Sequence, residues 1–224
     1  MTENYNKIPD IELFDEMVNP TISSPNCPYV LPFYQTRDTL IDVEVYRNFL
    51  RNAIKRFRTS RTYKNYKGFL MKLGADHCQF HGNITDEMAT LEMHHSMITI
   101  YDIAIIITEH VLNTSGMITT FDLAQLIRQE HITHHVQLVM LSLTPHQLFH
   151  NTEDFFIHPD MSITKQWYVF LEKYHTGITQ DIAFKILFYL KRALDEGGSN
   201  DGGLLELRER ILDWSQTNVQ LNYR

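Results

Sequence analysis

The sequence predicts an α+β fold that is mainly helical. Its 224 residues can bury one good core, or one core with an appended element. Hydrophobic residues make up 43% of the chain, and only 9 Gly and 7 Pro interrupt it, which is typical of a globular protein rather than a disordered one. Most segments repeat their apolar residues at helical spacing, whereas only a few short apolar runs fit strands.

The first 74 residues divide into an acidic arm and a basic helical region. Residues 1–38 predict an irregular arm with short strands at best, because proline recurs along them. Residues 39–74 predict one or two helices that break near Thr59-Ser60 and end at Gly74. The prolines of the arm are Pro9, Pro20, Pro25, Pro28 and Pro32.

The helical region is strongly basic, although the whole chain has a formal net charge of −7. Nine basic residues and no acidic residue lie between Arg47 and Lys72. Cations at every third or fourth position would line one face of a helix. With the aromatic residues between them, they fit a contact with a phosphate backbone or, equally, a solvated helix whose aromatic side chains pack inward. The candidates for nucleic-acid binding are Arg47, Arg51, Lys55, Arg58, Arg61 and Lys64.

A first strand is expected at residues 91–95, after a turn at 82–83. Its sequence is Leu-Glu-Met-His-His. Alternation along a strand would place Glu92 and His94 on one face and His95 on the other. The two adjacent histidines are therefore predicted to point in opposite directions.

Two helices and a second strand are expected next. The helices lie at about residues 99–113 and 121–131, the second with Asp122 in its first turn. The almost continuously apolar stretch 136–141 then predicts a strand, with Gln137 near its start. The helices are thus inserted between two strands.

A short helix is expected directly after the second strand, at residues 144–151. Thr144 is its expected N-cap, and Pro145 fits the first helical position. His146 and His150 would then lie one turn apart on the same face, as a chelating pair does.

The remaining segments predict a C-terminal helical region over residues 161–224. A short strand precedes it at 155–157. Its helices are expected at about 163–175, 179–195 and 204–216, with a Gly-rich polar linker at 196–203. The last helix could pack back on the core or bind a partner.

The histidines are unevenly placed, since all 12 lie between His77 and His175. Imidazole is the commonest metal ligand and titrates near neutral pH, so an adjacent pair followed by H-x-x-x-H indicates a metal beside a general base. His134 and His135 could face the same cleft. A lone histidine is more often a surface or satisfied core residue, which is the interpretation of His110, His131, His158 and His175.

The strands, the helix and their histidines resemble the ββα-metal motif of the HNH endonuclease family over about residues 77–151. That family has a doubled histidine on the first strand, usually Asn at the start of the second, and one or two histidines on the helix. Gln137 stands at the Asn position here. The paired C-x-x-C knuckles are missing, because 78–81 reads CQFH and 142–145 contains no zinc ligand. By this resemblance residues 75–160 are an HNH-like core with a helical insertion.

The resemblance implies a metal-dependent DNA endonuclease, a hydrolase that cleaves phosphodiester bonds by a one-metal mechanism in a phage context. His95 would be the general base, and Gln137 would orient it. His94, His146 and His150 would hold one divalent ion, which could be Mg, Mn, Ni or Zn. Two alternatives remain open. One is a degenerate HNH-like protein that binds DNA or has a structural role without cleaving, and the other is a helical protein-interaction module.

The sequence also bears on location and partners. Cys27 and Cys78 do not make a disulfide framework, and no apolar run approaches the length of a membrane span. The first residues lack the charged and apolar regions of a signal peptide. We therefore expect a soluble protein in the cytoplasm of a bacterial or phage-infected cell. DNA is its expected partner, together with a protein bound by the acidic surface or the last helix, and the oligomeric state stays open.

Overall fold

The computed structural model describes residues 34–151 and 155–222, with the side chains of 149–151 and 218–222 left out of the description. Residues from Gln35 onward belong to one unit. Most of the predicted acidic arm lies outside the described residues. Within the described part, no helix is both long and apolar enough to cross a membrane.

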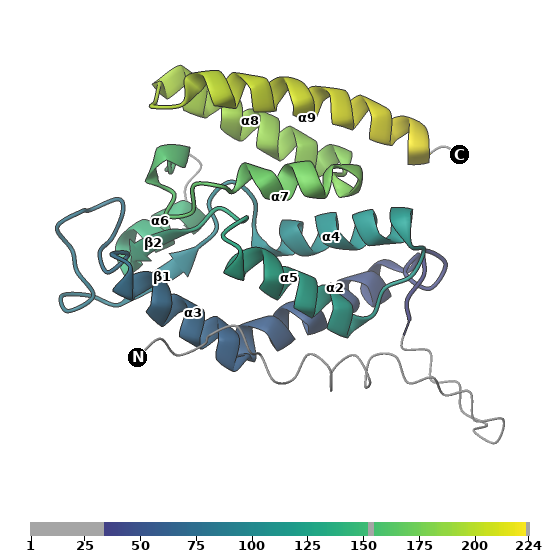
Figure 1. Ribbon diagram of the computed structural model, residues 1–224, viewed down its shortest axis with the longest axis horizontal. Helices are drawn as coiled ribbons and strands as arrows, with labels where there is room; N and C mark the ends of the chain where they lie inside the picture. Colours follow the sequence, from purple (N-terminus) through teal and green to yellow (C-terminus); the bar gives the residue numbers. More distant parts are fainter. Residues whose placement is uncertain (1–33, 152–154, 223–224) are drawn as a thin grey trace, which may run out of the picture. The chain divides into compact units, whose positions relative to one another are not determined.

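The described chain is mainly helical with one small sheet, which confirms the predicted α+β class (Figure 1). Two 3-10 turns, η1 (Pro159–Met161) and η2 (His175–Gly177), interrupt the second half. The helices and strands are α2 (Val43–Thr59), α3 (Arg61–Lys72), β1 (Leu91–His94), α4 (Ile100–Thr114), α5 (Thr120–Ile132), β2 (Val139–Ser142), α6 (Leu143–Asn151), α7 (Tyr168–Lys173), α8 (Gln180–Glu196) and α9 (Asp201–Asn222).

The basic region forms two helices, as predicted, and Ser60 separates them. Asp42 caps α2 by accepting hydrogen bonds from the backbone N–H groups of Glu44 and Val45. Ser60 ends α2 in an extended conformation, and its hydroxyl accepts from Tyr63 N to begin α3. A serine at an N-cap stabilises the new helix start, which explains the break at this position.

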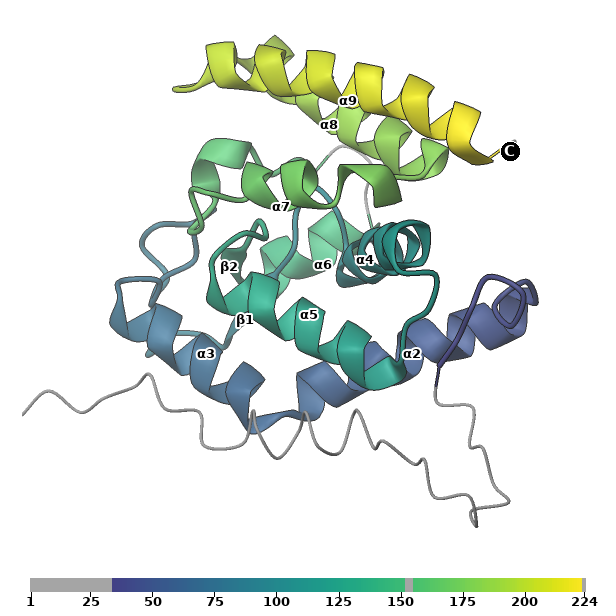
Figure 2. The ribbon, with the colours of Figure 1, turned by 45° about the vertical axis from the view of Figure 1, so that its right-hand side comes forward.

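Helices α4 and α5 each begin with a complete capping box. Thr99 and Asp102 exchange hydrogen bonds at the start of α4, and Thr119 and Asp122 do so at the start of α5. These boxes explain why both predicted helices form within one residue of their expected bounds. Figures 1 and 2 place α4 and α5 between the α2–α3 pair and the α7–α9 helices.

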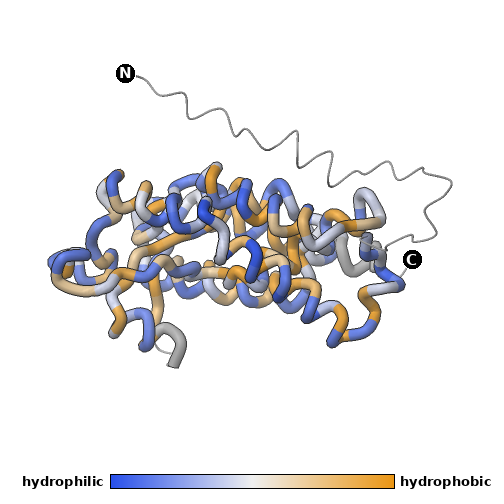
Figure 3. Tube along the Cα trace, turned by 90° about the horizontal axis from the view of Figure 1, so that it is seen from below, coloured by the Kyte–Doolittle hydropathy of each residue, from blue (hydrophilic) through white to orange (hydrophobic). Residues whose placement is uncertain are grey.

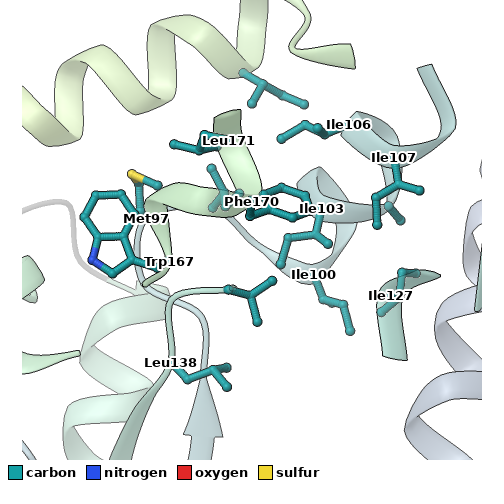
Figure 4. Packing of buried hydrophobic residues seen from close by; sticks show 14 of the residues in the cluster. Met97, Ile100, Ile103, Ile106, Ile107, Ile127, Leu138, Trp167, Phe170 and Leu171 are labelled. Carbon is teal, nitrogen blue, oxygen red and sulfur yellow. The ribbon is translucent and has the colours of Figure 1, made fainter. Parts of the chain in front are cut away.

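The core is centred on the apolar face of α4. Ile103, Ile106 and Ile107 are fully buried, and Figure 4 shows Phe170 of α7 beside Ile103. The hydropathy colouring in Figure 3 shows hydrophobic and hydrophilic residues alternating along the helices, as expected for helices that bury only one face. The buried face of α4 is thus covered in part by α7.

The sheet consists of β1 and β2, paired antiparallel with Leu91 opposite Ser142 and His94 opposite Val139. β2 begins three residues later than predicted. The reason lies in Leu138, whose carbonyl accepts from Ile163 N at 2.8 Å and whose N–H donates to the Thr164 hydroxyl at 3.2 Å. Residues 136–138 thus bond to 162–164 instead of continuing the ladder.

Helix α6 follows β2 without a connecting residue, so the predicted start at Thr144 is wrong. Leu143 already belongs to the helix, and Pro145 is its third residue rather than its first. Both positions lie in the first turn, where a proline leaves no intrahelical hydrogen bond unmade.

The C-terminal region departs from prediction at its start, and its last helix is longer than the predicted 204–216, because α9 begins at Asp201 within the predicted linker 196–203. Residues 155–157 are not a strand, and α7 is shorter than the predicted 163–175 because residues 162–164 bond to 136–138. Helices α8 and α9 form and pack side by side (Figure 1). Leu204, Leu207 and Ile211 of α9 are buried, so this helix packs back on its own chain.

Candidate functional site

The adjacent histidines at the end of β1, His94 in the strand and His95 just after it, point to different neighbours, as strand alternation predicts. His94 lies against His146 of α6, with ring centroids 5.0 Å apart. His95 instead reaches His131 of α5, and their Nε2 atoms lie 2.9 Å apart. Both His94 and His95 are buried.

Helix α6 places His146 over the face of β1 that carries Glu92 and His94. The Nδ1 atom of His146 lies 2.9 Å from Glu92 Oε2, and the His146 side chain is largely covered whereas Glu92 is open to solvent. The structure therefore brings two of the three predicted metal ligands, His94 and His146, into contact. The side chain of the third, His150, lies outside the described residues.

The metal itself stays a prediction. Among the side chains that the structure describes, no group of three or more His, Cys, Asp or Glu is placed to hold a metal ion. One ring nitrogen of His146, Nδ1, is already engaged by Glu92.

The protons of the His95–His131 pair can be assigned from their partners. His131 Nδ1 lies 2.7 Å from the Ile127 carbonyl oxygen, which can only accept, so this nitrogen carries the proton. The Nε2 atom of neutral His131 then accepts, and His95 Nε2–H donates to it. His131 is thus a satisfied core residue, in agreement with the interpretation of it as a non-ligand.

Burial holds both histidines of this pair neutral. Desolvation lowers the pKa of His131 to about 4, against an ordinary value of 6.5, although its bond to Ile127 and the charge of Glu130 act in the other direction. Desolvation, followed by the neighbouring His131, lowers the pKa of His95 well below its usual range. Neither ring carries charge at neutral pH.

This pair predicts a loss of stability in mild acid. Because the unfolded chain binds a proton at His131 near pH 6.5 and the folded chain only near pH 4, the free energy of unfolding should fall as pH drops between these values. The difference of about 2.5 pKa units corresponds to about 3 kcal/mol at pH 4. Urea titrations at stepped pH measure this slope.

The matched controls for that slope are two histidine variants. His131→Gln should remove the part of the slope that His131 contributes and keep the part from His95, whereas His77→Gln, at a side chain 40% exposed, should keep the whole slope. A stability that stays flat for the wild type between pH 7 and pH 4.5 would contradict the assignment.

Gln137 does not hold the position that the HNH resemblance implies. Its Oε1 accepts from Met97 N at 3.0 Å, and its Nε2 donates to the Tyr189 hydroxyl at 3.0 Å. Tyr189 in turn donates to the Ile157 carbonyl at 2.7 Å. Both polar atoms of the amide are therefore bonded away from His95, and they tie the segment before β2 to Met97 and to α8.

All six basic candidates lie on the surface of α2 and α3. Arg47, Arg51, Lys55 and Arg58 follow one another at intervals of four, four and three residues, opposite the buried face of α2. We call these four the α2 basic stripe. Arg61 and Lys64 continue the exposed positive charge on α3.

A buried carboxylate that sequence reasoning missed lies one position before His131. Glu130 is fully buried, accepts from Tyr174 at 2.9 Å and Lys173 at 2.6 Å, and lies 2.9 Å from His135 Nδ1. The signal was available, because Glu130 follows Leu123 and Ile127 at helical spacing on the apolar face of α5. A charge at such a position requires buried partners.

Comparison with known proteins bears on the nuclease hypothesis and its two alternatives. A model of a family described as bacteriophage G278-like virion protein matches residues 10–222. No curated protein and no solved structure matches.

The matched family corrects the assignment to HNH endonucleases. It describes a virion protein, so the predicted nuclease and hydrolase activities are wrong, and only the phage association is retained. The geometry agrees with this correction, since the proposed base His95 is bonded within the core and Gln137 is bonded to other elements. The chain belongs to the bacteriophage G278-like virion protein family.

Proposed function

We propose that this chain is a structural, non-enzymatic component of the phage particle, which acts by binding its neighbours. The observation that carries the proposal is the match of a virion-protein family to nearly the whole chain, residues 10–222. The alternative of a helical interaction module, raised from the sequence, agrees with this role.

The internal contacts of the polar core support a structural role. A general base must reach a water molecule beside the substrate, but His95 is buried and donates to His131. Glu130 and Asp102 each join separate helices by hydrogen bonds or ion pairs, and Gln137 joins the segment before β2 to α8. Polar groups satisfied in this way rigidify a core and do not need a substrate.

Complementation tests the proposal in a phage whose own copy of the gene is inactivated. His146→Ala removes a contact that is partly open to solvent, and it should support the same yield of particles as wild type. Glu130→Ala, which damages the core, should lower the yield through loss of folded protein. A loss of particles with His146→Ala, when the protein remains folded and abundant, would show that histidine chemistry matters and would overturn the proposal.

A second candidate function is contact with nucleic acid through the α2 basic stripe. Of its four residues, Arg47 pairs with Glu44 on the same helix, and the stripe exposes its positive charge along three turns. Phosphate contacts of this kind are independent of sequence and depend strongly on salt. A particle component with this surface would meet the packaged genome.

Charge reversal on the stripe tests this candidate. Arg51→Glu with Lys55→Glu should weaken binding to double-stranded DNA by roughly tenfold or more at low salt. It should also flatten the plot of log affinity against log salt by about two, because each lost phosphate contact lowers the slope by about one. Fluorescence anisotropy over a range of salt concentrations measures both effects.

The control changes the same net charge elsewhere. Lys165→Glu with Arg208→Glu alters two exposed cations outside the stripe and should leave the salt slope unchanged. If both pairs weaken binding equally, the attraction is a property of net charge and not of the stripe.

A further inference from the structure

Helix α8 carries two large aromatic side chains on its outer face. Phe184 is 62% exposed and Phe188 is 71% exposed, although the helix buries Ile182, Ile186 and Leu190 on its other face. Single exposed apolar residues are common on protein surfaces and need no explanation. Two phenylalanines one helical turn apart form a continuous apolar patch of the kind that marks an interaction site.

The residues around this patch follow the spacing of a coiled-coil seam. Asp181, Phe184, Phe188 and Lys191 are separated by three, four and three residues, and all four are exposed. Side chains with this spacing lie along one stripe of a helix and can meet a second helix. We call these four residues the α8 seam.

The α8 seam is complementary to itself when two copies run antiparallel. Its two phenylalanines lie two residues on either side of position 186, and its two charges lie five residues on either side of it, with opposite signs. A two-fold axis through this level therefore brings phenylalanine onto phenylalanine and carboxylate onto ammonium. Isologous interfaces have this property, since each pair of contacts occurs twice.

We infer that the α8 seam is the site at which a second copy of this chain docks, antiparallel to the first. Phe184 of one copy packs against Phe188 of the other, and Asp181 of one copy meets Lys191 of the other. Parallel docking is disfavoured, because it would place Asp181 on Asp181 and Lys191 on Lys191.

The charges next to the seam fit this arrangement. Lys191 already lies 2.6 Å from Asp195 on its own helix, and both side chains are about two-thirds exposed. An ammonium group has three donors, so Lys191 can bind both carboxylates. Lys185 is held 2.7 Å from Asp102 of α4 and does not compete for Asp181.

The small apolar area of the α8 seam limits the affinity of the dimer. A buried phenylalanine covers about 150–250 Å², so four of them supply less area than the roughly 1,600 Å² of a standard stable interface. We therefore expect a reversible dimer whose population rises with protein concentration. A high local concentration in an assembling particle would favour it.

Sedimentation velocity over a wide concentration range tests the inference on the full chain. The wild type should shift from monomer to dimer, and Phe188→Ala should raise the dissociation constant by roughly tenfold or more. Phe69→Ala is the matched control, because Phe69 is also exposed, at 49%, but lies on α3. A wild type that stays monomeric, or equal effects of the two substitutions, would overturn the inference.

Charge exchange tests the antiparallel register. Asp181→Lys alone places Lys opposite Lys191, and Lys191→Asp alone places Asp opposite Asp181, so each should weaken the dimer. The two single variants mixed together, and the double variant alone, restore opposite charges at both ends and should restore association. Parallel docking places like charges together in the wild type, in each single variant and in the double variant. It therefore predicts that none of these changes alters association by a single protein, and this result would overturn the register.

Discussion

We expect Gly177→Ala to lower the free energy of unfolding by about 3 kcal/mol. Gly177 ends the η2 turn, where it crosses α4 at close range. A Cβ atom at this position would lie 1.9 Å from the Ile106 carbonyl oxygen and 2.7 Å from His110 N. Both are backbone atoms of a buried helix, so the clash cannot be relieved by rotating a side chain.

Gly68→Ala is the matched control for this substitution. Gly68 lies within α3, and a Cβ atom there would meet no atom within 4 Å. Replacing a helical glycine by alanine at an open position should stabilise the protein by about 0.5–1 kcal/mol. Denaturant titrations of both variants give the comparison. A Gly177→Ala variant as stable as wild type would show that α4 and η2 do not approach so closely.

Glu130→Ala should destabilise the protein by a similar amount, about 3 kcal/mol. The substitution removes a buried carboxylate and leaves the Tyr174 hydroxyl without its acceptor in the core. It also leaves the positive charge of Lys173 without its partner, although the Lys173 side chain is 47% exposed and water can solvate it in part. The loss should therefore come mainly from Tyr174 and from the link between α5 and α7.

The control for this variant is Glu209→Ala on the exposed surface of α9, which should change stability by less than about 0.5 kcal/mol. Thermal and denaturant unfolding of both proteins provide the measurement. Equal stability of Glu130→Ala and wild type would mean that the buried carboxylate contributes little beyond what an apolar side chain supplies.

The helices were predictable from the sequence because local signals agree with the fold. The capping boxes Thr99-Asp102 and Thr119-Asp122 and the break at Ser60 all depend on side chains that bond to their own backbone. Such contacts form within one turn and do not need the rest of the chain. The predicted separation of His94 from His95 succeeded for the same reason, since alternation is a local property of a strand.

The partners of residues 136–138 were not predictable, because they come from residues 162–164, more than twenty positions later. This pairing shortened both β2 and α7 relative to expectation. The contact of His95 with His131 is equally non-local. Strand alternation gave the direction of the His95 side chain but could not identify the residue that it meets.

The nuclease assignment failed because spacing alone does not separate chemistry from packing. Two strands and a helix with histidines place His94, Glu92 and His146 close together, whatever the purpose of the contact. To separate a catalytic site from a packing contact, one must know what else each residue binds. Gln137, for example, donates a hydrogen bond to Tyr189. A family match over residues 10–222 then overruled a motif that covers about a third of the chain.

Quantitative mass spectrometry of purified phage particles tests the central claim most directly. If the chain is a structural component, its copy number relative to another virion protein should stay constant through successive density-gradient purifications. It should also remain constant after washing at high salt, which removes adsorbed proteins. A protein abundant in infected cells but progressively lost from the particles during purification would contradict the account.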